Sequence, residues 1–174
     1  LDSHLTGPAE DGGRFHVYYA NQEPSGAGAN LDRDDVSSYG PETTTITEFR
    51  SGTYRYSVFN YSNQSDDGAV GIAESPARVT VYDSNGQQAS YTAPSADAGD
   101  GNTWRVLEIA GGSMAFDDNG GDTFGYYDAD DSRDVDTFTD EAEGILVKDE
   151  GKTQHTPRQR RLLRRIFDRP VDAF

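Results

Sequence analysis

Short runs in which apolar and polar residues alternate recur along the first two thirds of the chain, separated by clusters of Gly, Pro, Asn and Asp. Alternation with a period of two is typical of half-buried β-strands, and such clusters are typical of turns. The pattern predicts seven strands: Asp2–Thr6, Arg14–Ala20, Thr43–Phe49, Thr53–Tyr61, Ala77–Asp83, Gln87–Thr92 and Thr103–Ala110. We therefore expect an all-β fold, an antiparallel β-sandwich of about seven to eight strands.

Two segments carry this pattern most clearly. The run Thr53–Tyr61 is rich in aromatic and β-branched residues, which a pleated surface prefers. Its alternation places Tyr54 and Val58 on one face and Arg55 on the other. Asn85-Gly86 is a hairpin signal, so we expect the strands before and after it to pair.

The chain changes character after the strand-rich region. Residues 1–116 form the predicted β domain, 117–153 an acidic loop or extension with a short strand at Ile145–Val147, and 154–174 a basic tail. In the tail, Thr156 suits a helix N-cap, Pro157 suits the first helical position, and Pro170 ends the pattern. Apolar residues share one face of this amphipathic helix: Leu162, Leu163, Ile166 and Phe167.

The composition limits the partners of the chain. There are 22 Asp and 9 Glu against 13 Arg and 2 Lys, and the formal net charge is −16. Phosphate repels such a body, so nucleic acid is a poor partner. An excess of Asp over Lys suits a high-salt habitat and suits a calcium-rich cell surface equally well. No apolar run is long enough for a transmembrane helix, and the lack of Cys excludes disulfides and thiolate ligands.

The densest group of carboxylates lies in Leu31–Glu42, read as a short acidic turn that ends in Gly40-Pro41 before the next strand. So much local negative charge is costly unless a cation neutralises it, and Ca²⁺ prefers several oxygen ligands. The alternative is a solvated loop whose Asp side chains cap turns. We predict a Ca²⁺ site made by the acidic turn and the first strand, with the ligands Asp2, Asp32, Asp34, Asp35 and Glu42.

Four segments, in order, resemble a known family: L-D-S-H-L-T-G-P, R-F-H-V-Y-Y-A-N, L-D-R-D-D-V-S-S-Y-G-P-E-T-T-T-I and G-T-Y-R-Y-S-V-F-N-Y. Together they are similar to the YfaP-type domain, a family of secreted bacterial β-sandwich modules. The resemblance covers roughly residues 1–110 and implies a sandwich in an extracytoplasmic setting, with no established catalytic activity. The first Asp of the family's start motif would precede Leu1, and we expect the chain to be a processed or truncated piece.

Other candidate sites are weaker. The spacing of EF-hand ligands recurs at Asp130, Ser132, Asp134, Asp136 and Glu141. Val135 stands where that loop needs Gly, so we do not expect an EF-hand, and an irregular calcium loop within residues 117–136 is the alternative. His4 shares a strand face with Asp2, and we favour a hydrogen-bonded structural histidine over a transition-metal ligand.

Catalytic motifs are lacking. There is no Gly-x-Ser-x-Gly elbow, phosphate loop or His-Glu-x-x-His motif, and the chain has three histidines. We expect no enzymatic activity, and a secreted hydrolase that uses two carboxylates is the remaining enzymatic alternative.

The function that the sequence predicts is a calcium-binding structural or assembly subunit of a surface structure or filament, located outside the cell or at its surface. Six Arg and two Asp give the tail a charge of +4, and the rest of the chain carries −20. We expect self-association of the tail on an acidic surface through Arg158, Arg161, Leu162, Arg165 and Ile166. The tail could equally pack on its own domain or bind an acidic membrane surface.

A second function remains open at this point, that of a carbohydrate- or protein-binding adhesion module of a larger secreted protein. Its partner would be a glycan or a surface protein. Aromatic rings that could stack on sugars occur at Tyr18, Tyr19, Tyr126 and Tyr127.

Overall fold

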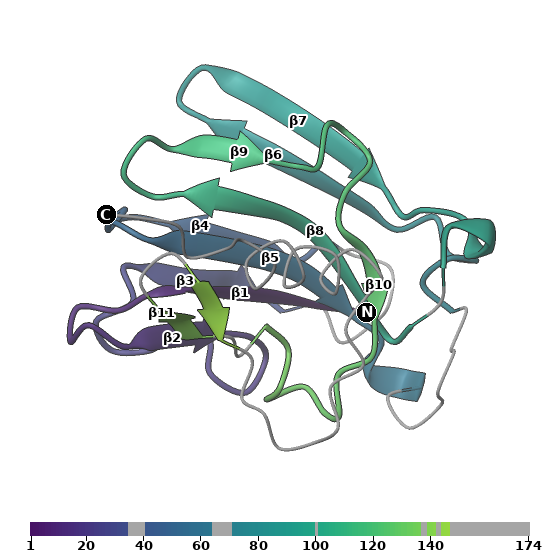
Figure 1. Cartoon of the computed structure of the whole chain (residues 1–174), viewed down its shortest axis with the longest axis horizontal. Helices are drawn as coiled ribbons and strands as arrows, with labels where there is room; N and C mark the ends of the chain where they lie inside the picture. Colours follow the sequence, from purple (N-terminus) through teal and green to yellow (C-terminus); the bar gives the residue numbers. More distant parts are fainter. Residues whose placement is uncertain (35–40, 64–70, 100, 137–138, 142–143, 147–174) are drawn as a thin grey trace, which may run out of the picture.

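The computed structural model describes residues 1–34, 41–63, 71–99, 101–136, 139–141 and 144–146. A central antiparallel sheet has the strand order β10–β8–β5–β1–β2, with β9 also paired to β8 (Figure 1). The bounds of its strands are β1 (Asp2–Pro8), β2 (Arg14–Val17), β5 (Thr53–Phe59), β8 (Thr103–Ala110), β9 (Ala115–Asp117) and β10 (Gly125–Tyr127). The expected all-β, antiparallel class is confirmed.

Three two-stranded antiparallel ladders accompany this sheet. They are β3 (Ala29–Arg33) with β4 (Thr43–Ile46), β6 (Arg78–Asp83) with β7 (Gly86–Thr92), and β11 (Thr139–Glu141) with β12 (Gly144–Leu146). Two single turns of 3₁₀ helix, η1 (Tyr61–Asn63) and η2 (Ala96–Ala98), are the helical elements of the described residues. Within that part of the chain, no helix is long and apolar enough to span a membrane.

The alternation pattern located the strands well. Each of the seven predicted strands overlaps an observed one, and the Asn85-Gly86 hairpin joins β6 to β7 as expected. The prediction missed β3, because Asp32 and Arg33 suggested a turn. It also missed β9, β10 and β11, which are three residues long each. The helix predicted for 154–174 lies outside the described residues.

One face of the central sheet carries the main hydrophobic core. Side chains of β1, β2, β5 and β8 meet there with side chains from the β3–β4 and β6–β7 ladders, so both ladders pack on this face. The alternation predicted for β5 is confirmed, since Tyr54 and Val58 belong to this core. Buried members of the core include Leu5, Val17, Leu31, Tyr54, Val58, Tyr91, Trp104 and Ile109.

The opposite face, here called the polar face, is also buried but carries charge. Arg55 and Ser57 of β5 are 1% and 0% exposed, and His4 of β1 is 0% exposed. A bulge between Arg105 and Leu107 of β8 sets Arg105 opposite Ser57 and Glu108 opposite Arg55. Polar groups buried in this way need partners, and these partners define the site region.

Candidate functional site

The predicted calcium ligands include one carboxylate that links the acidic segment to the first strand. Glu42 precedes β4, and its Oε2 accepts a hydrogen bond of 2.6 Å from the backbone N–H of Ser3 in β1. Its other oxygen, Oε1, is buried and has no hydrogen-bond partner among the described residues. Burial raises the pKa of Glu42, the bond from Ser3 lowers it, and the charges of Asp2 and Asp34 raise it further. The negative charge of the ionised Glu42 carboxylate is therefore only partly compensated by the groups around it.

Asp2 belongs to the same electrostatic group. Burial raises the pKa of Asp2, the positively charged N-terminus lowers it, and Asp34 raises it. Asp34 is partly engaged, because its Oδ2 accepts a bond of 3.3 Å from Gln22 Nε2. The structure thus brings Asp2, Asp34 and Glu42 within electrostatic reach of one another.

The remaining predicted ligands behave differently. Asp32 lies in β3, and its carboxylate accepts hydrogen bonds from Asn30 Nδ2 at 2.7 Å and from the hydroxyl of Thr45 on β4. Asp32 therefore supports the β3–β4 ladder, whereas Asp35 lies outside the described residues. Among the described residues, no group of three His, Asp or Glu side chains is placed to hold a metal ion. A cation would have to draw Asp2, Asp34 and Glu42 closer together than they are.

The second acidic stretch uses its carboxylates for internal contacts. Asp118 accepts hydrogen bonds from Tyr91 and the backbone of Gly121, and Asp128 accepts one from the backbone of Asn102. Asp136, the seventh residue of the EF-hand spacing, is 1% exposed and points into the polar face. Asp136 is therefore used for an internal contact of the polar face.

Asp136 makes the main charged contact of the polar face. Its carboxylate forms an ion pair with Arg105 of β8 and accepts the hydroxyl of Ser57 from β5. Burial alone would raise the pKa of Asp136, but Arg105 and the Ser57 hydroxyl more than offset this and hold the pKa below its usual value. A second pair, Arg55 with Glu108 at 2.9 Å, crosses from β5 to β8. Sequence reasoning missed both pairs, although Arg55 and Arg105 at inward positions of strong strands were the available signal.

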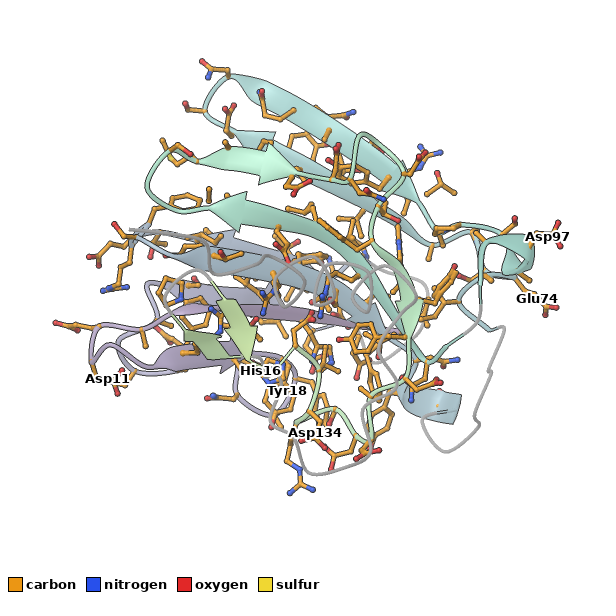
Figure 2. All side chains as sticks on the ribbon, viewed as in Figure 1. Asp11, His16, Tyr18, Glu74, Asp97 and Asp134 are labelled. Atoms are coloured by element: carbon orange, nitrogen blue, oxygen red, sulfur yellow. The ribbon has the colours of Figure 1, made fainter. Side chains whose placement is uncertain are left out.

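A histidine pair lies beside this network. His4 Nδ1 and His16 Nε2 are 2.8 Å apart, and Tyr18 stacks on His16 with ring centroids 4.4 Å apart (Figure 2). Burial and, to a smaller extent, the charge of His16 lower the pKa of His4 to about 3, against an opposing effect of Asp136. Burial also lowers the pKa of His16 to about 4, against an opposing effect of Asp136. Both rings are therefore neutral at pH 7, and His4 is hydrogen-bonded as expected.

An open pocket of about 570 Å³ adjoins the pair. Its walls include Thr6 and Pro8 of β1, Arg14 and His16 of β2, and Asp136. Arg14 donates to the hydroxyl of Thr6 at 3.2 Å, so the polar wall is internally bonded. Since Asp136 and His16 line it, this pocket offers solvent or a small ligand access to part of the polar face.

The tyrosines proposed for sugar stacking separate into two groups. Tyr126 is 7% exposed and Tyr127 packs against the buried Phe59 cluster, so neither presents a free ring. Tyr18 and Tyr19 are in edge contact at 5.3 Å, and Tyr19 contacts the exposed Tyr61 in the same way. The structure therefore replaces Tyr126 and Tyr127 with Tyr61 as a candidate sugar contact.

Comparisons with known proteins add no family to this picture. A scan against protein-family models finds no match, and searches of curated proteins and of solved structures find none either. The resemblance to the YfaP-type domain remains a prediction from the sequence motifs.

Replacement of Asp136 tests the charged contact. In Asp136→Asn, Arg105 keeps its buried position and loses its countercharge, so we expect the free energy of unfolding to fall by about 3–5 kcal/mol. Asp131→Asn is the matched control, because it removes an ion pair with the exposed Arg133 and should change little. Urea unfolding of both variants measures the difference. Equal, small effects would show that the buried pair is not important for stability.

Proposed function

We propose that the chain is a calcium-binding β-sandwich module of a secreted or surface protein, with a structural role and no catalytic one. The observation that carries the proposal is Glu42, which joins the acidic segment to β1 and keeps one buried oxygen without a hydrogen-bond partner in the part of the chain that the structure describes. A bound cation would satisfy that oxygen and neutralise the repulsion from Asp2 and Asp34. The motif resemblance to the YfaP-type domain supports the same class of protein.

The sandwich is proposed from the shared core. The central sheet would form one layer, and the β3–β4 and β6–β7 ladders would form the other. Leu31 of β3 and Tyr91 of β7 belong to the same buried cluster as Trp104 of β8, which supports this assignment. Two sheets that bury a common apolar face are the usual solution for antiparallel strands of this length.

Calcium is the cation that fits the donors best. Asp2, Asp34 and Glu42 offer carboxylate oxygens, and Ca²⁺ accepts six to eight oxygen ligands in irregular geometry. Mg²⁺ is a poorer match, because it requires near-ideal octahedral geometry and gives up its waters reluctantly. Bound Ca²⁺ would fix the end of β1 against the segment before β4, and so stabilise the fold by binding to the folded state.

The proposal predicts a calcium effect that depends on Glu42. Ca²⁺ at one hundred times its dissociation constant should stabilise the protein by about 2.7 kcal/mol, seen as a higher melting temperature that a chelator reverses. Glu42→Gln should lose this calcium-dependent stabilisation. In chelator the variant should be as stable as the wild type or slightly more stable, because the raised pKa of Glu42 means that its ionised form destabilises the folded protein at neutral pH.

Glu74→Gln, which changes an exposed carboxylate, should keep the full calcium response. The measurement is differential scanning calorimetry in calcium, magnesium and chelator. A melting temperature of the wild type that is the same in calcium and in chelator would reject the calcium proposal.

We further propose that copies of the chain assemble through the basic tail, whose residues Arg158, Arg161, Leu162, Arg165 and Ile166 lie outside the described residues. The opposite charges of tail and body, +4 and −20, support a head-to-tail contact, which gives open filaments when the rotation does not close. A chain that ends at Thr153 should therefore run smaller in size-exclusion chromatography than the full chain. A higher salt concentration should reduce the apparent size of the assembly that the full chain forms, because salt screens the attraction between tail and body. The same elution of both chains would contradict a role for the tail.

A second candidate function is glycan binding by an adhesion module. The exposed Tyr61, in ring contact with Tyr19, favours it, because aromatic rings stack on sugars. Glycan-array binding that Tyr61→Ala abolishes would favour this function over a purely structural one. If no glycan on the array binds the wild-type chain, the glycan-binding function is rejected.

A further inference from the structure

The hairpin between β6 and β7 contains one of the two Asn-Gly dipeptides of the chain, Asn85-Gly86, and the other is Asn119-Gly120. In such a dipeptide the backbone nitrogen of the glycine can attack the side-chain amide of the asparagine. Glycine favours this attack, because it has no side chain to hinder a close approach and its backbone is conformationally free. The structure places the two dipeptides in different surroundings, so their reactivity can be compared within one molecule.

The tip of the β6–β7 hairpin, which carries Asn85, lies at the outer edge of the molecule (Figure 1). Every residue from 82 to 88 is exposed, and a Cβ added to Gly86 would meet no atom within 4 Å beyond its neighbours in the chain. The amide of Asn85 donates a long hydrogen bond of 3.3 Å to Asp83 Oδ2, which is open to water. A tip without buried contacts opens locally at a small cost in free energy. The Gly86 nitrogen can therefore reach Cγ of Asn85.

Asn119 is held in a turn that is anchored to the core. Its Nδ2 donates to the backbone oxygen of Thr123 at 2.8 Å, and its backbone N–H donates to Asp117 at 2.9 Å. Thr123 is 4% exposed, and its hydroxyl accepts the indole N–H of the buried Trp104 at 3.0 Å. Asn119 would have to break its bond to Thr123 before Cγ could turn toward the nitrogen of Gly120. The fold therefore protects Asn119 and leaves Asn85 open to attack.

We propose that Asn85 is a site of spontaneous deamidation, which converts it to aspartate and isoaspartate through a cyclic succinimide. The Gly86 nitrogen gives up its proton and attacks Cγ of Asn85. The new N–Cγ bond forms, the Cγ–Nδ2 bond breaks, and the amide group leaves with that proton as ammonia. Water then opens the ring. Opening at Cγ gives aspartate, and opening at the backbone carbonyl of residue 85 gives isoaspartate, in which the main chain runs through the side-chain carbon.

Both products change the hairpin tip. Each adds a carboxylate beside Asp83, whose Oδ1 already accepts the backbone N–H of Asn85 at 2.7 Å, and like charges so close together repel. Isoaspartate also lengthens the main chain by one carbon, which conflicts with the pairing of Asp83 with Gly86 at the end of the ladder. We expect the tip to open while the inner pair of Val79 with Tyr91 remains, because Tyr91 is buried.

Peptide mapping of the full chain by mass spectrometry tests the proposal. The folded protein is incubated in mildly alkaline buffer, which favours loss of the proton from the glycine nitrogen, and both Asn-Gly dipeptides are followed in the same sample. We expect Asn85 to convert about tenfold or more faster than Asn119, since the tip opens more easily than the anchored turn. Residue 85 should contain both aspartate and isoaspartate. In urea, where no fold restrains either residue, the two rates should be similar.

Ammonia release provides a second measurement. Asn85→Gln should lose most of the ammonia that the wild type releases, because glutamine would have to form a larger ring and reacts far more slowly. Asn119→Gln is the matched control and should release nearly as much ammonia as the wild type.

The comparison of the two rates needs no variant, so a variant that fails to fold does not protect the proposal. Equal rates at Asn85 and Asn119 in the folded chain, or a faster rate at Asn119, would overturn it. A preference for Asn85 that persists unchanged in urea would show that the fold does not select this residue. Aspartate without isoaspartate at residue 85 would indicate direct hydrolysis and would reject the succinimide.

Discussion

The buried ion pair between Arg105 and Asp136 determines how the polar face of the central sheet can be closed. A guanidinium on the inward side of β8 cannot remain buried without a countercharge. Asp136 supplies that charge from 31 positions further along the chain and also accepts the hydroxyl of Ser57. The segment before Asp136 is thereby tied to the sheet, where Val135 and Ala129 pack on Phe59. Asp136 also lines the pocket and acts electrostatically on His4 and His16.

β1 connects this face with the rest of the molecule. Leu5 points into the hydrophobic core, and His4 points to the polar face. At the start of the same strand, the backbone of Ser3 holds Glu42. The link to Glu42 and the histidine pair therefore both depend on one strand that the central sheet pairs on each side, to β2 and to β5. A cation bound at Glu42 would act next to a strand whose position its two neighbours already fix.

Period-two alternation was enough to predict the strands that bury a regular face, as in Thr53–Phe59. In such a strand the face of each side chain follows from its position in the local sequence. It failed for β3, where Asp32 and Arg33 have charges that normally indicate a turn and are instead bonded across to β4. The sequence suggested that Glu42 lies near Asp2, as two ligands of one Ca²⁺ site, but it did not predict the hydrogen bond from Ser3 to Glu42. The pairing of Arg105 with Asp136, and of His4 with His16, depends on tertiary contacts that no local pattern encodes.

The central claim is that a cation completes the environment of Glu42. A crystal structure of the full chain grown with calcium, with anomalous scattering to identify the ion, tests it most directly. We expect an ion at about 2.3–2.6 Å from Glu42 Oε1, with Asp2 and Asp34 among its other ligands. A well-ordered Glu42 whose Oε1 has no ion within that distance would show that no cation completes this site.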